Sequence, residues 1–128
     1  MLAQPAGLLF SKDHEWVKLD GDVATIGITD YAQSSLGDIV YVELPRVGAT
    51  LTQFAGIGVV ESVKAVSDIF TPLGGEVLEI NPAIEADASL VNREPFGGGW
   101  FYKLKLADDA EKQNLMSGAD YDKLIAEA

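Results

Sequence analysis

Apolar and polar residues alternate along five short stretches of this chain. Alternation with a period of two is typical of β-strands that bury one face and expose the other. The stretches cover residues 15–19, 22–28, 38–44, 76–80 and 100–106. Glycine and proline residues separate them at the spacing expected of a small sandwich or barrel. The pattern therefore predicts a mainly β protein.

One segment between these strands has a helical rather than a β pattern. In residues 29–37, Thr29 or Asp30 is suited to cap the first turn of a helix, and Gly37 is suited to end it. We therefore expect a short helix in this segment.

The last part of the chain also departs from the alternation. Tyr121, Leu124 and Ile125 fall on one face of a helix, as expected for a helix with one buried side. We expect residues 108–128 to form a helical segment that packs on the sheets. The chain is long enough for one core and no linker divides it, so residues 1–128 are expected to form a single domain.

The chain is strongly acidic. It has 20 Asp and Glu residues against 9 Lys and Arg residues, which gives a formal net charge of -11 at pH 7. Such a surface repels phosphate backbones and anionic lipids and attracts basic protein surfaces. No apolar run approaches the length that crosses a bilayer. We therefore expect neither nucleic acid nor a membrane among the partners.

The residue types that carry most metal and nucleophilic chemistry are scarce. The absence of cysteine excludes disulfides, thiolate zinc sites and cysteine nucleophiles, and the single histidine, His14, excludes a site built from several histidines. We expect no metal site and no catalytic residue. The first ten residues lack the basic flank of a secretory signal and the arginines of a transit peptide, so the cytoplasm is the expected location.

Two polar or glycine-rich motifs have simple structural explanations. Asp13, His14 and Glu15 would point to alternate faces if they lay in one strand, and could not converge on an ion. No G-x-S-x-G motif accompanies His14, which argues against a serine hydrolase. Residues 97–99 are all glycine and precede a strand rather than a helix, which favours a turn over a phosphate site.

Lys64 lies between two strand-like runs, GIGVVESV at 56–63 and DIFTP at 68–72. Because so few residues separate the runs, we expect Lys64 at or beside the tip of a hairpin, with its ammonium in solvent. Most lysines in turns only increase solubility. An exposed amine on a rigid tip is also a suitable nucleophile for acylation, and a group attached there could reach several active sites. The spacing alone does not decide between these roles.

Four ordered motifs cover most of the chain: KDHEWV at 12–17, GITDYAQSSLGDIVYVELPRVG at 27–48, ESVKAVSDIFTPLGGEV at 61–77, and VNREPFGGGW at 91–100. Together they resemble the H protein of the glycine cleavage system, a lipoyl carrier. The resemblance implies a barrel-sandwich hybrid of the biotinyl- and lipoyl-carrier type. This fold has two small antiparallel sheets, here with short helices including one at the C-terminus, and carries the modified lysine in a tight turn.

The resemblance implies that Lys64 carries lipoate in amide linkage. Biotin carriers of this fold usually flank their lysine with methionine, whereas Val63 and Ala65 stand here, which favours lipoate. The implied function is that of a carrier and not an enzyme. It would take the aminomethyl group of glycine from a pyridoxal phosphate glycine decarboxylase to a tetrahydrofolate-dependent aminomethyltransferase, and electrons to dihydrolipoamide dehydrogenase. A lipoyl relay or a regulatory H-like protein outside glycine cleavage is the alternative.

Two further residues are predicted to guide a lipoate-attaching enzyme to its lysine. Glu61 lies three residues before Lys64, close enough along a strand to be recognised together with the tip. Gly48 is expected to shape a neighbouring turn after Pro45. The simpler alternative is that Glu61 is a solvated charge and Gly48 only a turn residue.

Carboxylates near the arm are predicted to hold its loaded end, which is a cation that water would otherwise hydrolyse. The candidates for this arm cleft are Glu15, from the HEW motif that lines the cleft in the proteins that this chain resembles, and Asp68. Asp13 stands where the family often has serine, and Ser35 where some members have a second histidine. In the simpler alternative Glu15 and Asp68 are surface acids.

Overall fold

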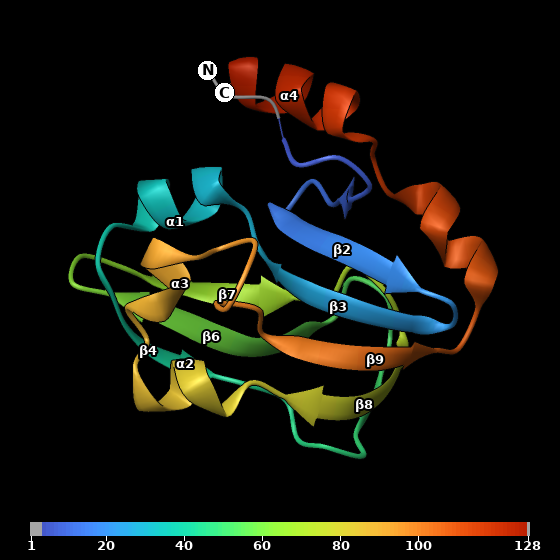
Figure 1. The fold of residues 1–128 in the computed structure, drawn as a ribbon, viewed down its shortest axis with the longest axis horizontal. Helices are drawn as coiled ribbons and strands as arrows, with labels where there is room; N and C mark the ends of the chain where they lie inside the picture. Colours follow the sequence, from blue (N-terminus) through green and yellow to red (C-terminus); the bar gives the residue numbers. More distant parts are fainter. Residues whose placement is uncertain (1–3, 128) are drawn as a thin grey trace.

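The computed structural model describes residues 4–127, which form two antiparallel sheets and several short helices (Figure 1). The larger sheet has the strand order β1-β2-β3-β9-β8-β5. Its strands are, in that order, Leu9–Phe10, Glu15–Asp20, Val23–Ile28, Tyr102–Leu106, Gly75–Ile80 and Thr50–Leu51. Strands β2, β3, β8 and β9 lie within a few residues of stretches that the alternating pattern predicts, whereas the two-residue strands β1 and β5 were not predicted.

The smaller sheet consists of β4 (Ile39–Glu43), β6 (Gly56–Ser62) and β7 (Val66–Phe70), with β6 in the centre. Its buried apolar side chains are Ile39, Val42, Val60 and Ile69. They join residues of the larger sheet, such as Val17 and Leu104, in one apolar core. Two packed antiparallel sheets around this core confirm the predicted barrel-sandwich fold.

The predicted helix at residues 29–37 is present as α1 (Asp30–Leu36). The side chain of Thr29 accepts a hydrogen bond from the Ala32 N–H, so Thr29 rather than Asp30 is the N-cap. Gly37 ends the helix with a φ of 82°, a left-handed conformation that glycine adopts without steric cost.

Two short helices were not predicted from the sequence. They are α2 (Pro82–Ala86), capped by Asn81, and α3 (Leu90–Arg93). Each is too short to show a helical period, and both follow β8 and precede β9 along the chain. Figure 1 shows them below and beside α1 at the same end of the molecule.

The C-terminal part contains a 3-10 helix (Asp109–Asn114) and α4 (Gly118–Ala126). Tyr121 of α4 is fully buried and stacks on Phe10 with 4.8 Å between ring centroids. Trp16 and Ile125 complete this second apolar cluster, and Leu124 packs against it. The end of the predicted segment, residue 128, lies outside the described residues. No helix among residues 4–127 is long and apolar enough to cross a bilayer.

Candidate functional site

Lys64 lies at the tip of the hairpin formed by β6 and β7. These strands pair up to Glu61 and Val66, so the four residues 62–65 form the loop, two positions earlier than the sequence indicated. Two valines near the lysine point outward: Val63 is 70% and Val66 is 65% exposed. The tip therefore presents the lysine to solvent beside two uncovered valine side chains.

Ser62 makes the tip rigid through local hydrogen bonds. Its N–H donates to the carbonyl of Ala65 at 2.8 Å. Its hydroxyl oxygen accepts from the N–H groups of Lys64 at 3.3 Å and Ala65 at 3.1 Å. A serine at this position thus satisfies the backbone of the turn that carries the lysine.

A second brace comes from Asn92 of α3. Its side-chain oxygen accepts from the Ile39 N–H at 2.9 Å, and its NH2 group donates to the Gly37 carbonyl at 2.9 Å and to Gln33 at 2.8 Å. The Val63 N–H in turn donates to the carbonyl of Asp38. Helix α3 therefore fixes the 37–39 loop, and this loop holds the tip.

The side chain of Lys64 runs past Gly37. A Cβ atom placed on Gly37 would lie 3.5 Å from Cε of the lysine, which is an ordinary van der Waals contact, so the lysine side chain lies alongside the Gly37 backbone. No ion pair of Lys64 occurs within residues 4–127. Its amine is therefore available to another molecule.

Glu61 is close to this tip, whereas Gly48 is not. Tyr41, Glu61 and Val66 form one cross-strand row on the outer face of the smaller sheet. Gly48 donates its N–H to Val77 of the larger sheet and follows the Glu43 end of β4, while the tip lies beyond the other end of that strand. The structure does not bring the two predicted recognition residues together.

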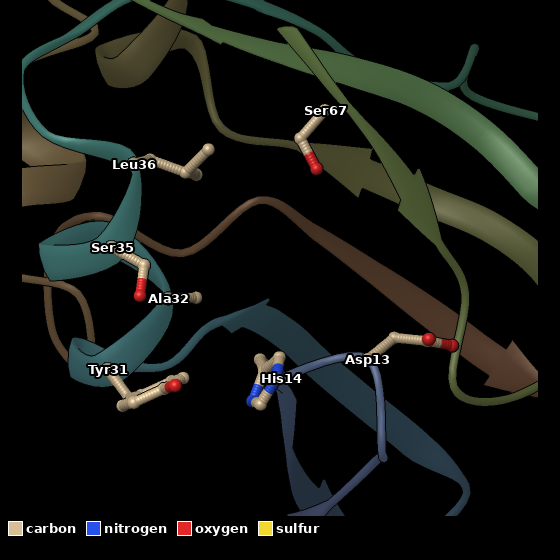
Figure 2. Close-up of a pocket in the computed structure, with 7 residues that line it drawn as sticks. All are labelled: Asp13, His14, Tyr31, Ala32, Ser35, Leu36 and Ser67. Carbon is tan, nitrogen blue, oxygen red and sulfur yellow. The ribbon is translucent and has the colours of Figure 1, made fainter. Parts of the chain in front are cut away.

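A pocket of about 280 Å³ lies next to the tip (Figure 2). Its walls come from the turn before β2, from α1 and from β7, and consist of Asp13, His14, Tyr31, Ala32, Ser35, Leu36 and Ser67. Leu36 precedes the glycine that Lys64 passes, and Ser67 is three residues beyond the lysine on β7. Because a strand rises about 3.3 Å per residue, the pocket is within about 10 Å of the lysine along the chain.

Neither predicted cleft acid is among the residues that line this pocket. Asp68 is exposed on the outer face of β7. Glu15 is 2% exposed and accepts hydrogen bonds from the Ser11 hydroxyl at 2.5 Å and the Phe70 N–H at 3.4 Å. Burial raises the pKa of Glu15 to about 8, so its carboxyl group is mainly protonated at neutral pH when no cation is bound. Asp13 is the acid in the pocket wall.

His14 has a different setting from the strand position that we predicted. It lies in the turn before β2 with a φ of 69°, so only Glu15 of the DHE motif is in the strand. Its Nδ1 is 2.9 Å from the hydroxyl of Tyr121, which is also 2.7 Å from Thr29 Oγ1. Burial lowers the pKa of the imidazole, with the charge of Asp13 acting in the opposite direction. No cluster of metal-ligating side chains occurs in the described part of the chain.

The sequence motifs did not single out Ser62, Asn92 or Tyr121 for these roles. Ser62 could have been found, because a serine two residues before a turn lysine is a common way to satisfy turn amides. Asn92 and Tyr121 could not, since their partners lie 53 or more residues away along the chain.

Residues 8–128 match the profile of the family described as "Glycine cleavage H-protein". This chain belongs to the glycine cleavage H-protein family. Two bacterial relatives named "Glycine cleavage system H protein" are similar over nearly their whole length. The protein of Halothermothrix orenii is 52% identical over 96% of both chains, and that of Thermoanaerobacter sp. strain X514 is 57% identical over 94% of this chain and 95% of its own.

The fold is also that of a solved family member. The crystal structure of a glycine cleavage system H protein from Mycobacterium marinum matches with a TM-score of 0.87 and 32% sequence identity. The match covers 96% of this chain and 99% of that one. The family predicted from the four sequence motifs is thereby confirmed.

Proposed function

We propose that this protein is a lipoyl carrier of glycine cleavage and that Lys64 bears the lipoyl group. The observation that carries the proposal is an exposed amine, without an ion pair among residues 4–127, on a doubly braced hairpin tip next to a pocket, in a chain of the H-protein family. A long acyl group fits this setting because Lys64 is exposed at the hairpin tip. The lipoyl group supplies the redox and group-transfer chemistry, and the protein supplies position and protection.

The partners in this proposal are the three enzymes of the cycle and the enzyme that attaches lipoate. Glycine decarboxylase would load the aminomethyl group, the aminomethyltransferase would remove it, and dihydrolipoamide dehydrogenase would reoxidise the arm. The rigid tip favours this role, since a group held at a fixed root has a high effective concentration at each docked active site. We place this activity in the cytoplasm.

The pocket is the proposed resting place of the loaded arm. Its ionisable acid, Asp13, is suited to hold a cationic end through a charge-assisted hydrogen bond. Asp68 remains a proposed contact at the rim. Glu15 remains a proposed contact only if the arriving cation lowers the pKa of its buried carboxyl group enough for the proton to dissociate. A nearby positive charge has this effect because it favours the ionised form.

Recognition by the lipoate-attaching enzyme is proposed to involve Glu61 and Gly48. The position of Glu61 in the row beside the tip supports its role. A role for Gly48 in recognition requires that the lipoate-attaching enzyme contacts both ends of β4. We expect Glu61→Ala to slow lipoylation more than Gly48→Asn does. Equal rates in both variants and the parent would remove both residues from the recognition surface.

The attachment is tested by intact-mass measurement of protein produced with lipoate. The parent should gain one lipoyl amide, and Lys64→Arg should gain none, because the guanidinium keeps the charge but is not an acylation nucleophile. Lys18→Arg, which changes an exposed lysine on β2, is the control and should be modified like the parent. Acylation also removes one positive charge, so a native gel should show the formal charge moving from -11 to -12.

The role in glycine cleavage is tested separately by reconstitution. Lipoylated protein is mixed with the decarboxylase, and the exchange of the glycine carboxyl group with labelled bicarbonate is measured. Exchange that depends on Lys64 supports the carrier function. A lipoylated protein that supports no exchange, yet donates lipoate to a second carrier, would indicate the relay instead.

A further inference from the structure

The histidine in the pocket has a conformation that its surroundings must maintain. A positive φ is unfavourable for a residue with a Cβ atom and persists where other contacts hold it. His14 donates its N–H to the Ser11 carbonyl at 3.1 Å, and its own carbonyl accepts from the Thr29 N–H at 3.0 Å. Figure 2 shows the resulting imidazole between Asp13 and Tyr31, pointing into the pocket.

The ring is held by a chain of hydrogen bonds that starts in α1 and passes through α4. The Ala32 N–H donates to Thr29 Oγ1, Thr29 Oγ1 lies 2.7 Å from the Tyr121 hydroxyl, and that hydroxyl lies 2.9 Å from His14 Nδ1. Thr29 and Tyr121 are both fully buried. Each proton in this chain therefore needs a partner within it.

Only one direction of donation satisfies every proton. If Thr29 donates to Tyr121 and Tyr121 donates to His14, then Nδ1 is an acceptor and every hydroxyl proton is used. In the opposite direction Thr29 would accept twice, and its own proton would have no partner among the described residues. Burial raises the pKa of Tyr121 to about 12, so its hydroxyl keeps the proton that it donates.

A hydrogen bond that Tyr121 donates to Nδ1 opposes protonation of the imidazole ring. Adding a proton to His14 would require Tyr121 and Thr29 to reverse and would leave a buried hydroxyl proton without an acceptor. Burial of the ring acts in the same direction. The groups that face the imidazole are the Asp13 carboxylate, which favours the cation, and the phenols of Tyr31 and Tyr121.

We infer that Tyr121, from the C-terminal helix, keeps the pocket histidine neutral, so that the pocket presents no second cation to the positively charged end of the loaded arm. The benefit to the loaded arm rests on the proposed carrier function. The neutral state of His14 does not depend on that function. Tyr121 is a positioning residue, since it acts through His14 and does not itself line the pocket.

The state of the ring can be observed directly, because His14 is the only histidine in the chain. Protein labelled with ¹⁵N at histidine gives one pair of imidazole signals. In unlipoylated parent protein we expect the tautomer with the proton on Nε2 and a titration midpoint below the ordinary value. A neutral ring with the proton on Nδ1 would overturn the inference, whatever the fate of the carrier proposal.

Tyr121→Phe is the decisive variant, because it keeps the ring that stacks on Phe10 and removes only the hydroxyl. The midpoint of His14 should rise. Tyr102→Phe is the matched control: its hydroxyl is buried and has no hydrogen-bond partner in the described residues, and its removal should leave His14 unchanged. An unchanged midpoint in Tyr121→Phe would also overturn the inference.

The consequence for the cargo is tested on lipoylated, loaded protein at two pH values. At a pH between the His14 midpoints of the parent and the variant, Tyr121→Phe should release formaldehyde and ammonia roughly fivefold faster than the parent, the size of a repulsion between two close unit charges in water. Above the midpoint the two proteins should decay equally. A rise in the midpoint with no difference in decay at the lower pH would show that His14 does not face the cargo.

Discussion

The hairpin tip and the neighbouring pocket are both part of the candidate site, but they are built in opposite ways. The turn of the tip is closed by contacts between residues two or three positions apart, from Ser62 to Lys64 and Ala65, and has one more distant brace through the 37–39 loop. The pocket depends on contacts across the chain, such as the one between His14 and Tyr121, which are 107 positions apart. The turn at the attachment point therefore forms mainly from local sequence, with one brace from outside it, while a protected space requires the complete fold.

The largest expected effect follows from removing the tertiary support of the pocket. Tyr121→Ala deletes a fully buried ring that stacks on Phe10, and should lower the free energy of unfolding by about 3–5 kcal/mol. Urea denaturation measures this loss. If the tip is independent, the folded fraction of this variant should still be lipoylated at the parental rate. A slower rate at equal folded concentration would show that the two regions are coupled.

The next effect concerns the buried carboxyl group of Glu15. Burial raises its pKa in the folded protein from an ordinary 4.5 to about 8. The folded state therefore holds this proton more tightly than the unfolded chain, and the stability that it provides is complete below pH 4.5 and is lost as the pH rises through 8.

Glu15→Gln should abolish that pH dependence, because glutamine does not titrate. The difference in unfolding free energy between the parent and this variant should fall by up to about 1.4 kcal/mol per pH unit across the window. Denaturation at pH 5, 6, 7 and 8 measures it. Parallel curves for the two proteins would mean that Glu15 has no raised pKa.

A smaller effect is expected where the tip meets the helix that braces it. Asn92→Ala removes three hydrogen bonds around the 37–39 loop and should cost about 2 kcal/mol. Asn92→Asp keeps the acceptor for Ile39 and should cost less. Hydrogen exchange of the Ile39 and Val63 amides reports whether the loop has loosened. Unchanged exchange in Asn92→Ala would show that the tip needs no brace from α3.

The smallest effect is predicted at the tip itself. Ser62→Ala removes the acceptor of the Lys64 and Ala65 N–H groups, which are near solvent, and should cost about 1 kcal/mol. Because the contacts are local, the pocket should not change, and the ¹⁵N signals of His14 should stay in place. A shift of these signals would contradict the separation between the two regions.

The same contrast explains what the sequence could predict. Most of the strands, α1 and the position of Lys64 follow from alternation, from Thr29 and Gly37, and from the short spacing between two runs, all of which are local signals. The residues of α2 and α3 have no period long enough to detect. The pocket and the burial of Glu15 result from the packing of α1 and β7 around the turn before β2, which no single segment determines. The sequence predicted Gly48 in a turn near Lys64, but the pairing of β4 with β6 places the two residues beyond opposite ends of β4.

One hydrogen bond outside both the tip and the pocket joins the first described residues to the C-terminal helix. The side chain of Gln4 donates a hydrogen bond to Asp122 at 3.0 Å, which joins points 118 positions apart. Figure 1 shows α4 and the first described residues at the top of the view, and the β6–β7 hairpin on a different side of the molecule. Fusion or immobilisation through either end should therefore leave Lys64 accessible. The ends could also be joined by a short linker and the chain reopened at the surface turn of residues 46–49, giving a circular permutant with the same modified tip.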